Sequence, residues 1–281
     1  MHRQRVWLVV TGLLSLFTVS AASHQSSPPD LATVEALASK PEAYADRQVR
    51  LQIFRALEAP SPEVLAAAVD LVMGSPDLSA DPQLWRRFNA ALSTSDPARR
   101  KAILDRATKK GMFTDVRIVA LIVEALTDED GTLRSTALGM VKSQPALQQN
   151  PAVADALTRR GEQVSTVVLP SFDVFKTRVQ PVLETVGSDK KRCASCHEEH
   201  SVLRLPSMDT PSFGEELLQA RYRAALRVVD LEAPESSLIL RKPTSPKNDA
   251  PLTHGGGVRF ERGTPAYQAI LEWIKTGEIR R

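Results

Sequence analysis

Apolar residues recur at intervals of three and four along most of the chain between residues 31 and 160. In the segment DVRIVALIVEALT, for example, Val119, Ile122 and Leu126 fall on one side of a helix. The alternation that is typical of strands is rare here, and Pro, Asp, Ser and Gly occupy the intervening turns. The pattern predicts a series of amphipathic helices with one buried face each, and therefore an all-α fold.

Part of this helical pattern repeats at a fixed interval. The segments PEVLAAAV, PARRKAIL and TLRSTALG begin 35 residues apart, and Ala67, Ala102 and Ala137 are aligned in them. A small residue at a fixed point lets successive helices pack closely, and a helix-pair period is typical of an α-solenoid. Residues 31–160 are expected to form a helical-repeat domain that resembles HEAT-like repeats, whose usual period is about 40 to 47 residues. An irregular helical bundle is the alternative.

The periodic pattern changes after residue 160. The stretch GEQVSTVVLP at 161–170 interrupts the helices, and residues 171–281 are expected to form a second domain. Its first helix contains Pro181, which predicts a kink or an early end. Its last helix begins in GTPAY with Thr264 as N-cap and ends at Gly277. The segment FGEELLQARYRAALRVV predicts a third helix between them.

The N-terminus has the pattern of a targeting segment. An apolar run from Val6 to Val19 follows two arginines and precedes the small residues VSAAS. This order is typical of a secretory signal peptide, with cleavage near Ala22. The run is shorter than the roughly 20 residues of a membrane-spanning helix, so an uncleaved membrane anchor is the alternative. We expect residues 1–22 to be removed and the mature protein to be periplasmic or exported.

The charge balance argues against one class of partner. The chain has 36 Lys and Arg and 33 Asp and Glu, a formal net charge of +3. Removal of Arg3 and Arg5 with the signal peptide lowers this to +1. A nearly neutral protein lacks the basic excess that binding to a phosphate backbone needs, so no nucleic-acid partner is expected.

Both cysteines of the chain lie in the motif CASCH. In an exported protein two cysteines would otherwise form a disulfide. Cys-x-x-Cys followed at once by His is instead the signature of c-type haem attachment. Cys193 and Cys196 would form thioethers to one haem c, and His197 would bind its iron on the proximal side. The alternatives are a dithiol redox pair and a zinc site that adds His200 and His254 to the two cysteines.

The second domain as a whole resembles the cytochrome c domains common in planctomycete-type secreted proteins. In that family a Phe-x-x-x-Val-x-Pro-x-Leu helix leads to the haem motif, and a Trp-Ile-x-x-Gly helix closes the domain. The matching residues here are Phe175, Val179, Pro181, Leu183, Trp273, Ile274 and Gly277. The resemblance implies a class I-like cytochrome c fold. Many family members carry catalytic or binding modules beside this domain, whereas only helical repeats accompany it here.

Two residues compete for the distal position on the iron. His254 lies in the segment HGGG just before the last helix, and the resemblance implies a ligand from that loop. Met208 is the only methionine of the domain, and the 11 residues that separate it from His197 span roughly 36 Å when extended. We predict His254 as the distal ligand, with Met208, or no protein ligand, as alternatives. His200 lies one helical turn after His197 and is expected to be a surface histidine.

These residues predict a periplasmic monohaem c-type cytochrome that transfers single electrons between redox partner proteins and is not an enzyme. The helical repeats would dock one partner, such as a secreted dehydrogenase. The alternative is a haem sensor or peroxidase-like protein with an open distal site. The basic run KKR at 190–192 and Arg259 are candidates for contacts to haem propionates or to a partner, with solvated charge as the alternative.

Overall fold

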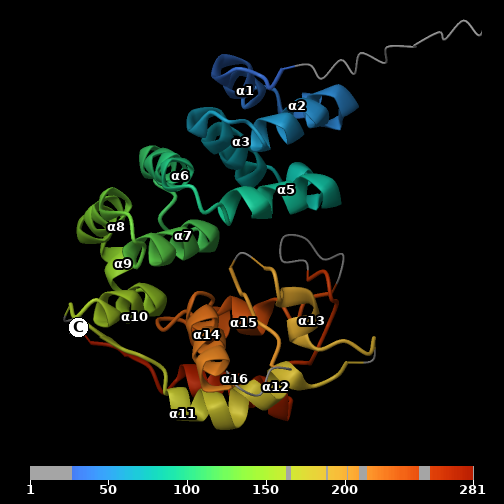
Figure 1. Ribbon diagram of the computed structural model, residues 1–281. Helices are drawn as coiled ribbons and strands as arrows, with labels where there is room; N and C mark the ends of the chain where they lie inside the picture. The colour runs from blue at the N-terminus through green and yellow to red at the C-terminus, as the bar shows by residue number, and fades with distance from the viewer. Residues whose placement is uncertain are drawn as a thin grey trace, which may run out of the picture.

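The computed structural model describes residues 27–162, 166–187, 189–200, 202–208, 214–246 and 254–280. Across these residues the fold is mostly helical, with one two-stranded sheet (Figure 1). The predicted all-α class is therefore confirmed. The predicted signal peptide lies outside the described residues. In the described part of the chain, no helix has the length and apolar character needed to cross a bilayer.

The first half of the described chain is a succession of helices that lie one after another in Figure 1. Their bounds are α1 (Leu31–Leu37), η1 (Pro41–Ala45), α2 (Arg47–Leu57), α3 (Pro62–Gly74), α4 (Pro76–Ala80), α5 (Pro82–Leu92), α6 (Pro97–Lys110), α7 (Val116–Leu126), α8 (Gly131–Ser143), α9 (Pro145–Gln148) and α10 (Pro151–Arg159).

Most of these helices begin at a residue whose side chain accepts a backbone N–H that the first turn leaves unpaired. These N-cap residues recur at a regular interval along the chain. One series of caps, on α2, α5, α7 and α10, is Asp46, Asp81, Asp115 and Asn150. The other series, on α3, α6 and α8, is Ser61, Asp96 and Asp130. Within each series the caps are 34 or 35 residues apart. The interval noted in the sequence is thus also the interval of helix starts.

The helices of the second series pack on one another, α3 against α6 and α6 against α8. Of the three aligned alanines, Ala67 and Ala137 are fully buried. Ala102 is only half-buried, so the close approach expected from a small residue applies at two of the three positions.

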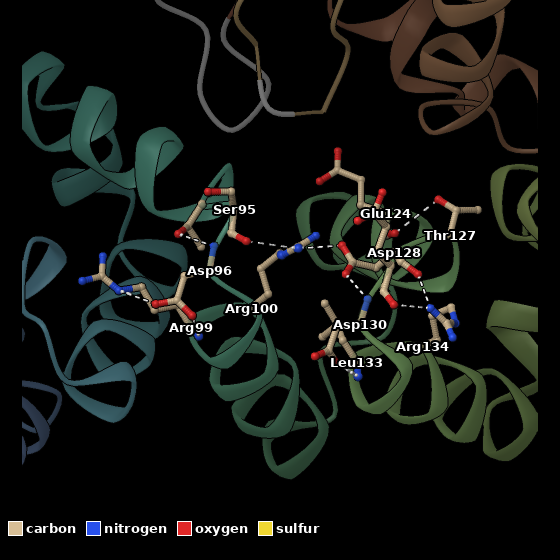
Figure 2. Close-up of polar contacts among 12 residues, drawn as sticks. Ser95, Asp96, Arg99, Arg100, Glu124, Thr127, Asp128, Asp130, Leu133 and Arg134 are labelled. Carbon is tan, nitrogen blue, oxygen red and sulfur yellow. Dashed lines mark hydrogen bonds and ion pairs between the residues drawn. The ribbon is translucent and has the colours of Figure 1, made fainter.

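A partly buried ion pair joins α6 to the turn between α7 and α8, as Figure 2 shows. Arg100 lies 2.6 Å from Asp128, and the backbone N–H of Asp130 donates to the same carboxylate. Burial alone would raise the pKa of Asp128, but these two contacts outweigh it and hold the pKa below its usual value. Since Asp130 in turn caps α8, the pair fixes the start of one helix relative to another.

The second half contains the remaining elements. Their bounds are β1 (Val167–Val168), α11 (Phe172–Val174), the π-helical turn η2 (Phe175–Val179), α12 (Gln180–Glu184), α13 (Cys193–His197), α14 (Gly214–Leu226), η4 (Pro234–Ser236), α15 (Leu238–Arg241), α16 (Pro265–Ile274) and β2 (Glu278–Ile279).

The first helix of this half is interrupted as Pro181 predicts. It runs as α11, then the π-helical turn η2, then α12, which contains Pro181. Proline has no N–H, and in a regular α-helix its ring would clash with the carbonyl of Thr177. The wider π-helical turn directly before it accommodates the proline without ending the helix.

The last helix, α16, starts as predicted, because the Thr264 hydroxyl accepts the backbone N–H of Tyr267. The role expected for Gly277 is wrong. The residues in the left-handed conformation that helix-ending glycines use do not include Gly277, and α16 ends at Ile274. A Cβ on Gly277 would instead lie 2.8 Å from Pro170 and 2.9 Å from Leu231. Glycine is needed there because other parts of the chain approach closely.

The segment between the two halves contains strand β1, which pairs with the last described element of the chain. Strand β1 pairs antiparallel with β2, with Val167 opposite Ile279. Helix α10 packs against α14 and against β1, and Glu124 of α7 lies 3.0 Å from Arg227. The buried residues of both halves form one connected hydrophobic cluster.

Candidate functional site

Helix α13 carries both thiols and the histidine of the CASCH motif. Cys193 is partly buried and Cys196 is exposed, and no disulfide joins them. Residues three apart lie on the same side of a helix, so the spacing directs both thiols to one side. Burial raises the pKa of the Cys193 thiol above its ordinary value.

The imidazole of His197 is oriented by the chain that follows it. Its Nδ1 lies 3.2 Å from the carbonyl oxygen of Leu203, and its own backbone oxygen accepts the N–H of Leu205 at 2.9 Å. A histidine that donates through Nδ1 keeps the lone pair of Nε2 free for a metal ion. Burial lowers the pKa of His197 to about 4, so the ring is neutral at physiological pH.

The glycine-rich loop holds His254 in the tautomer that also fits His197, with the proton on Nδ1. Nδ1 of His254 lies 2.6 Å from the carbonyl oxygen of Gly257, and the N–H of Gly257 donates back to the His254 carbonyl at 2.7 Å. Gly257 has a φ of 66°, in the left-handed region that favours glycine. A Cβ on Gly256 would lie 3.3 Å from Cε1 of His254. Gly256 and Gly257 therefore allow a tight turn in which Nδ1 of His254 donates its hydrogen bond and the lone pair of Nε2 stays unused.

The structure brings His197 and His254 together, although they come from distant parts of the sequence. Their ring centroids are 6.2 Å apart and their planes differ by 27°. Two imidazoles that bind one metal ion from opposite sides have centroids about 6 Å apart, because each metal–nitrogen distance is about 2 Å. The centroid separation suits two rings on one metal ion, and the hydrogen bonds of the Nδ1 atoms leave the lone pair of each Nε2 for a metal such as haem iron.

His200 differs from its expected role as a surface histidine. It is partly buried, with its ring centroid 4.9 Å from that of His197. Its Nδ1 accepts the backbone N–H groups of Val202 and Leu203, both at 3.2 Å. The ring therefore shapes the segment whose carbonyl orients His197. Within the described residues, no group of three or more His, Cys, Asp or Glu side chains is arranged to hold a metal ion.

The other candidate for the distal position, Met208, is partly buried and packs against the hydrophobic core. For His254, the ring centroid lies 6.2 Å from that of His197.

A buried arginine next to the site is not expected from the sequence. Arg221 of α14 is fully buried and forms an ion pair with Glu184 at the end of α12. Its Nε donates to the carbonyl oxygen of Pro206 at 2.9 Å, and Glu184 also pairs with Arg192 at 3.3 Å. These contacts join α12, α14, the start of α13 and the segment after His197. The one signal in the sequence is that Arg221 lies three residues after Leu218, on the apolar face of α14.

We expect the substitution Arg221→Met to lower the free energy of unfolding by about 3 kcal/mol, because it leaves Glu184 and the Pro206 carbonyl without their buried partner. Urea unfolding followed by circular dichroism would measure the change. Arg178→Met is the control, since its pair with Glu272 is half exposed and such pairs contribute about 1 kcal/mol or less. Equal losses in the two variants would contradict the prediction.

The basic residues near the motif divide into two kinds. Lys190 and Lys191 are exposed, in keeping with a solvated run. Arg259 is not a surface charge: its side chain is 11% exposed, its Nη1 lies 2.8 Å from Asp189, and its Nη2 donates to the carbonyl of Lys191. A contact between Arg259 and a propionate or a partner stays a prediction.

Comparisons of the chain with family models, with curated proteins and with solved structures found no match.

Proposed function

We propose that the protein is a monohaem c-type cytochrome that transfers single electrons between partner proteins. The observation that carries the proposal is the approach of His254 to His197 beside the two thiols of α13. When bound, the haem iron supplies one-electron oxidation and reduction.

Each site residue has a defined task in this proposal. Cys193 and Cys196 would hold the haem through thioether bonds, and Nε2 of His197 would be the proximal ligand. Nε2 of His254 would be the distal ligand. The hydrogen bonds from the two Nδ1 atoms to the carbonyls of Leu203 and Gly257 would fix both rings and make them stronger ligands.

An iron with two protein ligands favours electron transfer over ligand chemistry. A peroxidase or a gas sensor needs an open distal position, and His254 would fill it. Two imidazoles also give a lower reduction potential than an imidazole and a thioether. These points favour the electron carrier over the sensor or peroxidase.

The first half of the chain would be the docking part. The regular interval of helix caps and the packing of α3, α6 and α8 on one another favour a HEAT-like repeat domain over residues 31–160. Such arrays bind other proteins along an extended surface. We propose that this surface docks a redox partner, such as a secreted dehydrogenase, in the periplasm after removal of the signal peptide.

Optical spectra of the full chain, produced in cells that attach haem c, test the proposal. The oxidised and reduced proteins are expected to be low-spin, and carbon monoxide should change the reduced spectrum only slowly, because His254 must first leave the distal position. Ready binding of carbon monoxide would favour the sensor or peroxidase. A colourless protein that retains zinc would refute haem binding.

A further inference from the structure

Arg259 ties the loop of the proposed distal ligand to the segment that precedes the CASCH helix. It lies five residues after His254 in the sequence. Its guanidinium contacts both the Asp189 carboxylate and the Lys191 carbonyl, four and two residues before Cys193. Its backbone N–H donates to the carbonyl of Pro243 at 2.7 Å. Three attachments thus hold one residue of the loop.

The segment before the CASCH helix leaves room for the Arg259 guanidinium at Gly187. A Cβ on Gly187 would lie 2.8 to 2.9 Å from three guanidinium atoms of Arg259. Gly187 is not among the residues with a positive φ, so the reason for glycine here is space and not backbone conformation. The N–H of Gly187 also donates to the Lys191 carbonyl at 2.9 Å, which closes the turn that Arg259 binds. The fit is a second observation, independent of the ion pair.

Hydrogen bonds within the loop extend from His254 to Gly257, almost as far as Arg259. His254 and Gly257 exchange two hydrogen bonds, and only Val258 separates Gly257 from Arg259. A displacement of Arg259 would therefore move the turn that carries His254. The Arg259 side chain is well suited to this anchoring, because a guanidinium can bond a carboxylate and a carbonyl at once, and a lysine ammonium has no such fixed fork.

We propose that Arg259 is a positioning residue that holds the His254 loop over the iron and limits how fast the distal imidazole dissociates. The inference rests on the proposed function, since it concerns the rate at which His254 dissociates from the proposed haem iron. In this role Arg259 acts through its contacts with Asp189 and Lys191 and through Val258, which joins it to Gly257.

The test is the rate at which carbon monoxide binds to the reduced full-length protein with haem attached. Carbon monoxide can bind only after His254 has left, so at saturating gas the rate reports dissociation of that ligand. We expect the rate to rise about tenfold in Arg259→Met, which removes charge-assisted hydrogen bonds, and similarly in Gly187→Ala, which displaces the guanidinium. Arg259→Lys should lie between Arg259→Met and the unchanged protein.

Arg262→Met is the matched control, because it removes the same charge three residues away from an exposed position. Its rate should equal that of the unchanged protein. Unchanged rates in Arg259→Met and Gly187→Ala would overturn the inference, even if both variants melted at lower temperature. If Arg259→Met does not fold, Gly187→Ala and Arg259→Lys decide the question in the same way.

Failure of the proposed function is recognised before any variant is made. The unchanged protein would then lack thioether-bound haem, or would bind carbon monoxide at once without waiting for a ligand to leave. Either result overturns the proposed function and the inference together. A slow, saturating rate in the unchanged protein that Arg259→Met does not alter overturns the inference alone.

Discussion

Replacement of both Cys193 and Cys196 by alanine is expected to give a colourless protein. The two thioethers would be the only covalent bonds between chain and haem, and attachment is needed before the ligands can hold the haem in place. Cys196→Ala alone should leave at most one thioether. The measurement is haem absorbance that stays with the chain after denaturation and extraction with acidic acetone.

A control for this result should keep both thiols and change a neighbouring charge. Glu199→Gln serves, since Glu199 is exposed and lies two residues after the motif. It should retain the full amount of haem. Haem that leaves the unchanged protein on simple extraction would refute covalent attachment.

The second large effect is expected at the distal position. His254→Ala should convert a low-spin iron that binds carbon monoxide only slowly into one that binds it at once, because the imidazole 6.2 Å from the His197 ring is removed. Spectra of the reduced protein with and without carbon monoxide would detect the change. Met208→Ala is the comparison and should leave the spectrum nearly unchanged. The reverse pattern would move the distal assignment to Met208.

Local features were the most predictable from the sequence. The cap at Thr264 and the interruption at Pro181 depend on a few neighbouring residues, so the sequence contains all the information they need. The CASCH motif is equally local, because thioether chemistry requires thiols at a fixed spacing on one turn, but haem attachment there stays a prediction. The same holds for the interval of the helix caps in the first half.

Features that depend on distant partners were not predictable. The buried ion pair of Arg221 joins residues 37 apart, and that of Arg259 joins residues 70 apart. A charged residue on a helix or in a loop is exposed by default, and only the folded chain determines which charges are covered. Gly277 was misjudged for the same reason, since its neighbour Pro170 is far away in the sequence.

The approach of His254 to His197 lies between these cases. The glycine-rich loop before the last helix could be found in the sequence, and its resemblance to a family suggested a ligand there. The orientation of the ring could not, because it depends on how the chain folds the loop so that Nδ1 meets the Gly257 carbonyl and the ring lies beside His197.

The pairing of β1 with β2 bears on how such a protein can be assembled in evolution. Because Val167 lies opposite Ile279, the second half of the chain begins and ends at one place, beside the last helix of the first half. A unit with adjacent ends can be gained, lost or transferred as a single insertion, and it also tolerates new termini elsewhere. Transfer of this CASCH-bearing unit to another carrier would need only one short stem, but the new carrier would have to replace the contacts that α10 and Glu124 make with α14 and Arg227.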